Sequence, residues 1–398
     1  MDLPTCGKCG VPLSLPAGCC AHCGEPITVC LPDPNALLRR TANDTDPNPT
    51  LPPETAANQD DATKVETLLR NIAGQSHFEE RYDIRGLLAE GGMGQIFRAY
   101  DQILRREIAI KMTREDLRTR SSPAVRGQFL KEARVGGRLL HPNVLPVFDL
   151  GVNRSGHIYY TMRLVDGSSL RHCLSALDKA ILTKLITFPL RKIIESFVGA
   201  CHGVDYAHQN GVIHLDLKPD NILMSGFSEV FVIDWGLAKV DDVDDTEQLV
   251  DLYRQWSHAS NTASNTGVFG GPIIGTLGYM TPEQAQGDFQ SYDATTDVFG
   301  LGGILYAILY DQTPNQGRTD AEILRACMEP KRRGQLRKGI LPQGQRVKQE
   351  TLTAIESLEG LCLKALATNR AQRFQTVGAM IIELNEWLEA TPGPPLGF

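Results

Sequence analysis

The sequence predicts an α+β fold with two lobes, a small β-rich half followed by a larger helical half. Two patterns lead to this prediction. Apolar residues alternate in short runs that flank a glycine cluster near residue 90, which is typical of paired strands. Further along the chain the apolar residues recur with helical spacing over longer runs. A cleft between the two halves is the natural place for a ligand.

The strands of the first half are expected at residues 81–90 and 95–101, on either side of the glycine cluster, and at 106–112. In the last run Ile108, Ile110 and Met112 alternate with other residues. A helix is expected over 124–140, where His-Pro-Asn ends the periodic pattern. Two more strands are expected at 144–152 and 157–165.

Helices are expected to dominate the second half, beginning with a long one over 190–211 that Gly211 would terminate as a C-cap. The apolar run from Val298 to Tyr310 is too short to span a bilayer and contains glycines, so a buried helix is expected there. The sequence thus predicts no membrane span.

The bulk composition is that of a globular protein. The chain has 398 residues, of which 42% are hydrophobic and 22% charged, and its formal net charge is −7. A nucleic-acid partner is not expected, because phosphate backbones select basic surfaces. The N-terminus has no basic region followed by an apolar one, so no signal peptide is predicted, and the expected location is the cytoplasm.

Four regions are predicted along the chain. Residues 1–30 are rich in Cys and Gly, and residues 31–75 are rich in Pro, Asn, Asp and Thr, which is typical of a flexible linker. A short helix is expected over 64–72. Residues 78–390 are continuously globular, and the tail 391–398 is expected to be disordered.

The glycine cluster and the strand after it suggest a phosphate-binding site. Glycines between two strands let backbone N–H groups approach phosphates, although such a hairpin is more often only a turn. Lys111 ends the apolar run of residues 108–111, and Glu132 on the following helix is a candidate partner for it. A solvated strand end is the alternative interpretation of Lys111. A Walker-type P-loop motif is absent from the sequence.

The segment "HLDLKPDN" contains groups suited to phosphoryl transfer. Asp216 could accept the proton of an incoming hydroxyl, Lys218 could neutralise charge on the moving phosphoryl group, and Asn221 offers an oxygen to Mg²⁺. Asp234 follows an apolar run in "VFVIDWG" and could hold Mg²⁺ against phosphate oxygens.

Lys111, Glu132, "HLDLKPDN", "DWG" and "GTLGYMTPEQ" occur in the order and spacing of the eukaryotic-type Ser/Thr protein kinases and their bacterial relatives. The chain resembles this family over roughly residues 80–390. The resemblance implies a bilobal protein kinase fold, ATP and Mg²⁺ as nucleotide and metal, and Ser/Thr residues of proteins as acceptors. Lys218 resembles the Ser/Thr-specific pattern rather than the tyrosine-specific one.

The resemblance also implies roles for individual residues. Asp216 is expected as the catalytic base, with Lys218 and Lys111 as catalytic cations, and Asn221 and Asp234 as Mg²⁺ ligands. Met162 corresponds to the gatekeeper, and Arg163 to Val165 to the hinge that reads the adenine. The remaining nucleotide-binding residues implied are Ala89, Glu90, Gly91, Gly92, Gly94, Ile96, Ala109, Glu132 and Leu223. Structural roles are implied for Thr276, for Glu283 with Arg373, and for Asp297.

Three positions depart from the family pattern. Leu215 replaces the Arg that commonly precedes the catalytic Asp and pairs with a phosphorylated activation segment. We therefore expect activity without phosphorylation of that segment. Trp235 replaces the usual Phe, and Ala89 the first Gly of the loop. No departure removes a catalytic group, so an active kinase is favoured over the alternative, an ATP-binding pseudokinase scaffold.

The segment from Asp234 to Glu283 is unusually long and contains an acidic run followed by a polar one. Long loops are usually functional or disordered. It is interpreted either as a floppy insertion or as an autophosphorylation site, with five candidate acceptors: Ser257, Ser260, Thr262, Ser264 and Thr266.

Six of the ten cysteines precede residue 31. Cys6 with Cys9 and Cys20 with Cys23 form two C-x-x-C pairs, a spacing that resembles a zinc ribbon and suits four thiolates around one Zn²⁺. Cys19 and His22 are alternative ligands, and a disulfide knot is the alternative structure. The four scattered cysteines, Cys173, Cys201, Cys327 and Cys362, are expected to be plain core or surface thiols. A protein contact or regulatory role is expected for the ribbon, and the kinase itself could form a homodimer.

Overall fold

The computed structural model describes residues 77–91, 94–114, 123–182, 190–225, 229–240, 274–338, 340 and 349–391. These residues belong to one compact unit that spans 70–398. The predicted zinc ribbon, linker, short helix over 64–72 and C-terminal tail lie outside the described residues.

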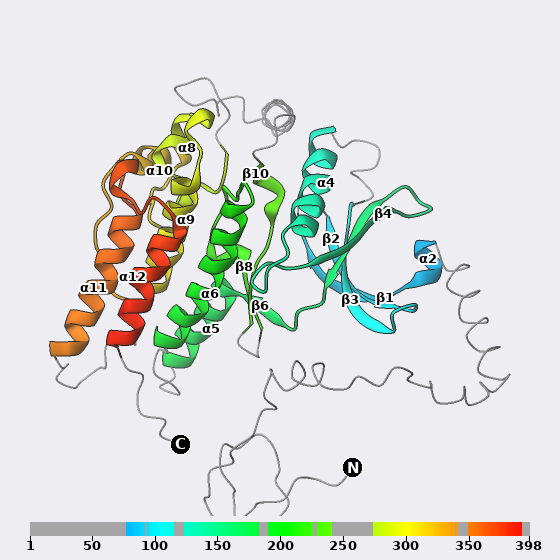
Figure 1. Cartoon of the computed structure of the whole chain (residues 1–398), viewed down its shortest axis with the longest axis horizontal. Helices are drawn as coiled ribbons and strands as arrows, with labels where there is room; N and C mark the ends of the chain where they lie inside the picture. Colours follow the sequence, from blue (N-terminus) through cyan, green and yellow to red (C-terminus); the bar gives the residue numbers. More distant parts are fainter. Residues whose placement is uncertain are drawn as a thin grey trace, which may run out of the picture. The chain divides into compact units, whose positions relative to one another are not determined.

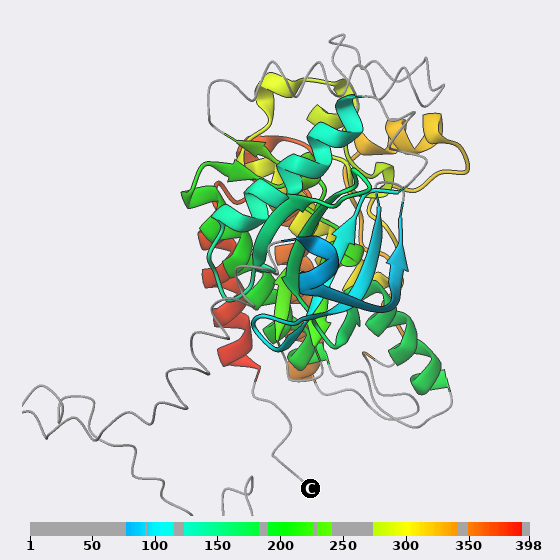
Figure 2. The same ribbon diagram turned by 90° about the vertical axis from the view of Figure 1, so that its right-hand side faces the viewer.

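A five-stranded antiparallel sheet forms the first lobe, with strand order β1-β2-β3-β5-β4. Helix α4 (Pro123–Arg138) packs on one face and the short helix α2 (Phe78–Arg81) on the other, as Figures 1 and 2 show. The strands are β1 (Tyr82–Glu90), β2 (Gln95–Asp101), β3 (Arg106–Met112), β4 (Val147–Val152) and β5 (Ile158–Arg163).

The alternation predicted for the third strand places its side chains on both faces of the sheet. Ile108 and Ile110 pack with Phe78 of α2, whereas Ala109 faces α4 and packs with Phe129. Because both faces are covered, the middle of the strand, Ile108 to Ile110, is buried, whereas its first residue, Arg106, is exposed. Helix α4 ends at Arg138, two residues before the predicted end.

The second lobe is mainly helical, and its long helices α6, α9, α11 and α12 lie side by side in Figure 1. Small sheets, β6-β8-β9 and β7-β10, lie between them and the first lobe. The helices are α5 (Leu170–Leu182), α6 (Leu190–Gln209), α8 (Pro282–Gln286), α9 (Ala294–Tyr310), α10 (Asp320–Cys327), α11 (Gln349–Ala365) and α12 (Val377–Ala390). The short strands are β6 (Gly167–Ser169), β7 (Val212–Ile213), β8 (Ile222–Ser225), β9 (Val230–Val232) and β10 (Lys239–Val240).

Five described turns are 3₁₀ helices: η2 (Pro219–Asn221), η3 (Trp235–Leu237), η4 (Leu277–Tyr279), η5 (Phe289–Ser291) and η6 (Arg370–Gln372). Three of them, η2, η3 and η4, contain or adjoin the predicted site residues Asn221, Asp234 and Thr276.

Helix α9 is the buried helix that the sequence predicts. All its residues after Ala294 are buried, and Asp293 caps its start by accepting a hydrogen bond from the N–H of Thr295. Among the described residues we find no helix that is both long and apolar enough to cross a bilayer. Gly211, the predicted C-cap beyond α6, has a φ of 70°, the left-handed conformation that favours glycine.

Candidate active site

A cavity of about 430 Å³ lies between the sheet of the first lobe and the small strands of the second. Its wall is more apolar than polar, and a few charged groups converge at one side, which is the usual character of a small-molecule site. Eleven of the predicted residues line it: Ala89, Ile96, Ala109, Lys111, Glu132, Met162, Arg163, Val165, Asn221, Leu223 and Asp234. Residues predicted from separate motifs thus line one cavity, and nucleotide binding by them stays a prediction.

Lys111 and Glu132 form the predicted ion pair. Lys111 Nζ lies 2.7 Å from Oε1 and 2.6 Å from Oε2 of Glu132, so the ammonium on β3 is held by a carboxylate on α4. Glu132 is only 7% exposed. Its burial raises the pKa of the carboxyl, and Lys111 opposes that shift. The pair thus fixes a cation at the wall of the cavity.

Tyr160 is a third member of this group that the sequence did not reveal. Its hydroxyl donates to Glu132 Oε1 over 2.7 Å from the neighbouring strand β5. Burial raises the phenol's pKa well above its usual value, so Tyr160 acts as a neutral hydrogen-bond donor. Pairing of β3 with β5 places Lys111 opposite Tyr160, and this register could not be read from the residues alone.

The glycine turn contributes less to the cavity than predicted. Gly91 N–H donates to Gly94 O over 2.9 Å, which closes the hairpin. A Cβ at position 94 would lie 2.5 Å from Met112 O, so only glycine fits there. Glu90, Gly91 and Gly94 do not line the cavity, and Gly92 lies outside the described residues. Phosphate binding by this turn stays a prediction.

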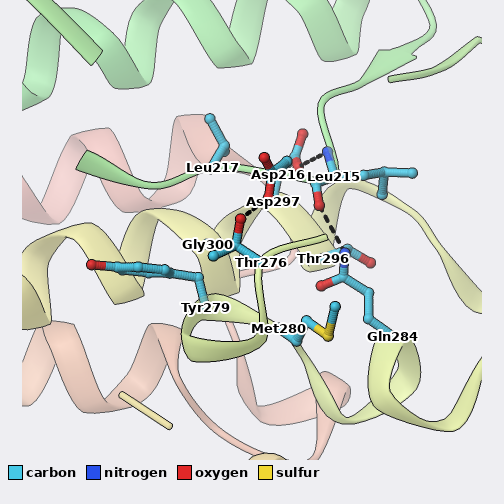
Figure 3. Close-up of a pocket in the computed structure, with 10 residues that line it drawn as sticks. All are labelled: Leu215, Asp216, Leu217, Thr276, Tyr279, Met280, Gln284, Thr296, Asp297 and Gly300. Atoms are coloured by element: carbon cyan, nitrogen blue, oxygen red, sulfur yellow. Dashed lines mark hydrogen bonds between the residues drawn. The ribbon is translucent and has the colours of Figure 1, made fainter. Parts of the chain in front are cut away.

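Asp216 and its neighbours form a compact hydrogen-bonded group, part of which Figure 3 shows. Lys218 Nζ donates to Asp216 Oδ2 over 2.6 Å and to Thr276 Oγ1 over 2.7 Å. Thr276 Oγ1 in turn donates to Asp216 Oδ1 over 2.7 Å. Both carboxylate oxygens are therefore oriented by the chain, and Thr276 braces the loop as expected.

Asn221 links this group to the cavity. Its amide nitrogen donates to the backbone oxygen of Asp216 over 2.8 Å, while the residue also lines the cavity wall. The amide oxygen of Asn221 and the carboxylate of Asp234 are hard oxygen donors in the same wall, which is the donor chemistry that Mg²⁺ selects. The residues present thus fit the metal that the sequence predicts.

Asp234 and Leu215 both adopt left-handed backbone conformations, with φ of 66° and 67°. Such angles are uncommon for residues other than glycine and persist only where surrounding bonds enforce them. For Leu215 those bonds are visible: its N–H donates to Asp297 Oδ1 over 2.8 Å, and its carbonyl accepts from Gln284 Nε2 over 2.8 Å. Figure 3 shows both contacts.

Asp297 fixes the backbone of His214 and Leu215 through hydrogen bonds, which is the structural role predicted for it. Its Oδ2 accepts from the N–H of His214 over 2.7 Å and lies 2.7 Å from His208 Nε2. Burial alone would raise the pKa of this carboxyl, but the hydrogen bonds and the two histidines outweigh burial and lower it. An ionised Asp297 therefore fixes the backbone directly before Asp216.

Trp235, which follows Asp234, packs in the core of the second lobe. It is buried, and its ring centroid lies 4.6 Å from that of His214.

Gly136 of α4 also lines the cavity, and a Cβ there would lie 2.8 Å from Val147. The glycine lets α4 approach β4 closely, which is a feature that sequence reasoning missed.

The predicted pairing of Glu283 with Arg373 is present. Arg373 is fully buried at its side chain and donates to Glu283 Oε1 over 2.7 Å and Oε2 over 3.0 Å. Its remaining donors reach backbone oxygens of Thr295 and Ala367. This pair ties the segment after Thr276 to the helical lobe, which is a structural role.

The chain matches the protein kinase domain family over residues 82–382. It is 32% identical over 322 residues to the serine/threonine-protein kinase PknD of Chlamydia caviae, which covers 79% of this chain and 32% of that protein. The identity to PknD of Chlamydia muridarum is 33% over 311 residues, covering 75% and 30%. For Chlamydia felis it is 36% over 253 residues, covering 61% and 26%. The chain spans about a third or less of the length of these relatives.

Proposed function

The chain belongs to the protein kinase domain family, and on that premise we propose that it transfers the γ-phosphoryl group of ATP to Ser and Thr hydroxyls of proteins. The observation that carries the proposal is that two clusters of hydrogen-bonded, charged side chains lie at one cavity. The Lys111–Glu132 pair lies in its wall, and the Asp216–Lys218–Thr276 group is joined to the wall by Asn221.

In the proposed reaction the chain's own residues position the reactants and stabilise charge. Apolar side chains of the cavity enclose the adenine, and Lys111 binds phosphate oxygens. Asp216 orients the acceptor hydroxyl and accepts its proton, while Lys218 stabilises charge on the transferred group. Asn221 and Asp234 would hold Mg²⁺, which supplies positive charge against the phosphates.

The experiment is transfer of labelled phosphate from ATP in the presence of Mg²⁺, using the purified full chain, with autophosphorylation and an added protein as readouts. Wild type should produce phosphoserine or phosphothreonine. Asp216→Asn should lower the rate at least about 100-fold. Asp205→Asn on α6, whose carboxylate accepts from Gln209 over 2.8 Å, is the matched control and should keep the rate. ATP binding without any transfer would favour the pseudokinase scaffold.

We also propose that activity does not require phosphorylation of the activation segment. Leu215 is 4% exposed and packs with Ile274, Phe289 and Tyr292, where the family pattern would place a cation. Gln284 Nε2 donates to Ile274 O over 3.1 Å as well as to Leu215 O. Apolar packing, together with hydrogen bonds from the Gln284 side chain to two backbone oxygens, thus holds the end of the activation segment beside the loop that contains Asp216.

The five candidate acceptors, Ser257, Ser260, Thr262, Ser264 and Thr266, lie outside the described residues. A variant with alanine at all five should keep the initial rate of transfer to an added protein. A loss of more than about tenfold, restored by an acidic residue at one of these positions, would refute the independence from phosphorylation.

Zinc binding at the N-terminus remains a separate proposal. Cys6, Cys9, Cys20 and Cys23 would hold one Zn²⁺ through thiolates, and its support is the ligand spacing in the sequence. These residues lie outside the described part of the chain. The purified protein should contain about one zinc per chain, and a Cys9→Ser, Cys20→Ser variant should lose it. Retention of zinc by that variant would shift the assignment to Cys19 and His22.

We propose that the partners of this chain are its protein substrates and that it acts in the cytoplasm. Neither a nucleic acid nor a membrane is proposed to take part. A homodimer is proposed as well, and light scattering of the full chain would test it directly. The net charge of −7 supports the exclusion of nucleic acid.

A further inference from the structure

A second hollow, of about 350 Å³, lies beside the catalytic loop. Pro219, which directly follows Lys218, forms one part of its wall, and Tyr279 of η4 forms another. Tyr279 also lines the small cavity behind Asp216 that Figure 3 shows, so the hollow adjoins the catalytic group. Pro219 is three residues from Asp216 and therefore at most about 11 Å from it, a distance that three residues of an extended acceptor chain also span. Side chains that flank the acceptor hydroxyl are therefore within reach of this surface.

Arg171 of α5 bridges the elements around the hollow. Its Nε lies 2.8 Å from Oδ1 and 2.7 Å from Oδ2 of Asp220, in the turn directly after Pro219. One terminal nitrogen donates to the Tyr279 hydroxyl over 3.1 Å. Arg171 therefore places a positive charge from this chain on the carboxylate of Asp220, four residues after Asp216.

Arg337 also lines the hollow and also pairs with carboxylates of the chain. Its guanidinium is almost fully buried and donates to the backbone oxygens of Ala307 and Ile308 at the end of α9. It also pairs with Asp178 and, over 2.9 Å, with Asp311. Asp311 lines the hollow, whereas Asp220 and Asp178 are held next to it by the two arginines that line it. Each of the three carboxylates is thus bonded to an arginine of the chain itself.

Paired carboxylates attract an incoming cation weakly, because their charge is already compensated at contact distance. We propose that Arg171 is a specificity-determining residue that neutralises Asp220, so that the surface formed by the hollow and the adjoining Asp220 selects acceptor sequences with uncharged rather than basic residues near the Ser or Thr. This inference rests on the proposed kinase function and names a class of substrate for it.

Arg171 is the member of this arrangement that can be changed safely. Its side chain is 49% exposed and that of Asp220 42% exposed, so their loss removes little packing. Arg337 is buried and holds the end of α9, so its removal would perturb the fold instead. The test therefore uses Arg171→Ala.

The assay measures kcat/KM for a parent peptide, with one Thr flanked by Ala and Gln, and for peptides with one Arg at each of the three positions on either side. In wild type no Arg peptide should exceed the parent by more than about twofold. In Arg171→Ala at least one should rise about 3- to 5-fold relative to the parent, the gain of one exposed ion pair. Adding Asp220→Asn to Arg171→Ala should abolish that gain.

A further variant serves as the control. Arg154→Ala removes an exposed arginine of the first lobe, away from the hollow, where it pairs with Glu80, and it should keep the wild-type peptide ratios.

Three results would overturn the proposal: a wild-type preference for an Arg peptide of about fivefold or more, equal ratios in wild type and Arg171→Ala, or a gain that survives Asp220→Asn. If wild type phosphorylates neither itself nor any peptide, the proposed kinase function fails and this inference with it. Transfer with unchanged ratios rejects the role of Arg171 alone.

Discussion

Asp297→Asn is the substitution that tests how the backbone before Asp216 is held. The two side chains have the same shape, but asparagine carries no charge and one of its two terminal atoms is a donor. Asp297 accepts from the N–H groups of His214 and Leu215 and contacts His208. The amide cannot satisfy both sides, because its NH₂ must face at least one N–H group.

The least costly orientation keeps the oxygen on His214 and His208 and turns the NH₂ toward Leu215. One hydrogen bond to a charged acceptor, worth about 1.5–3 kcal/mol, is then lost. The remaining bonds weaken because the acceptor is neutral. We expect a loss of about 3–5 kcal/mol in the free energy of unfolding. The left-handed φ of Leu215 also loses its main restraint, so Asp216 shifts and kcat should fall about 10- to 100-fold.

The assay combines urea unfolding, followed by fluorescence of the three tryptophans, with steady-state kinetics of peptide phosphorylation. Asp205→Asn serves again as the matched carboxylate control and should change stability by less than about 0.5 kcal/mol. A variant that unfolds at the wild-type urea concentration with unchanged kcat would refute this account of the loop.

Three more predictions concern the Arg373–Glu283 pair, the role of Lys111 and the pH dependence of stability that Asp297 causes. Arg373→Met leaves Glu283 buried without its cation and should cost about 3–5 kcal/mol in the free energy of unfolding, whereas Lys364→Ala, which breaks an exposed pair, should cost less than about 1 kcal/mol. Lys111→Met should lower kcat/KM at least about 100-fold while the circular dichroism spectrum stays that of wild type; an active variant would contradict the role of Lys111. The folded-state pKa of Asp297 lies below its ordinary value of 3.8, so its stabilisation is present above about pH 4 and is lost as the pH falls. Asp297→Asn should flatten that acid limb of the unfolding free energy, and an unchanged limb would show that other groups cause it.

The sequence predicted which motif residues lie near one another better than it predicted their other contacts. Lys111, Glu132 and Asp234 line one cavity, and Asp216 pairs with Lys218 next to it; the catalytic roles of these residues stay predictions. Each motif is local in the chain, so its residue types and spacing already determine which groups it can present. The alternation that predicted β3 succeeded for the same reason.

Contacts between distant segments could not be predicted. Tyr160 reaches Glu132 because of strand register, and Arg171 reaches Asp220 because a helix packs against a turn 49 residues away. Leu215 was recognised as a departure, but its packing with Ile274 depends on how the far end of the activation segment returns to the loop. Tertiary packing sets these contacts, and one sequence alone does not reveal it.

Helix ends showed a smaller discrepancy. The periodic pattern predicted that α4 extends to Leu140, but the helix ends at Arg138. His141 precedes a proline and is therefore biased away from helical angles, and helices usually end at or before such a residue.

The most direct test of the central claim is the first minutes of phosphate transfer by the full chain after complete treatment with phosphatase. The account holds that Leu215, Thr276 and Asp297 already position Asp216 without any phosphate group. It predicts product that accumulates linearly from the first time point, at a rate that prior incubation with ATP does not change. A lag that ends as the chain phosphorylates itself would contradict the preassembled site, and the absence of product at all times would contradict the kinase.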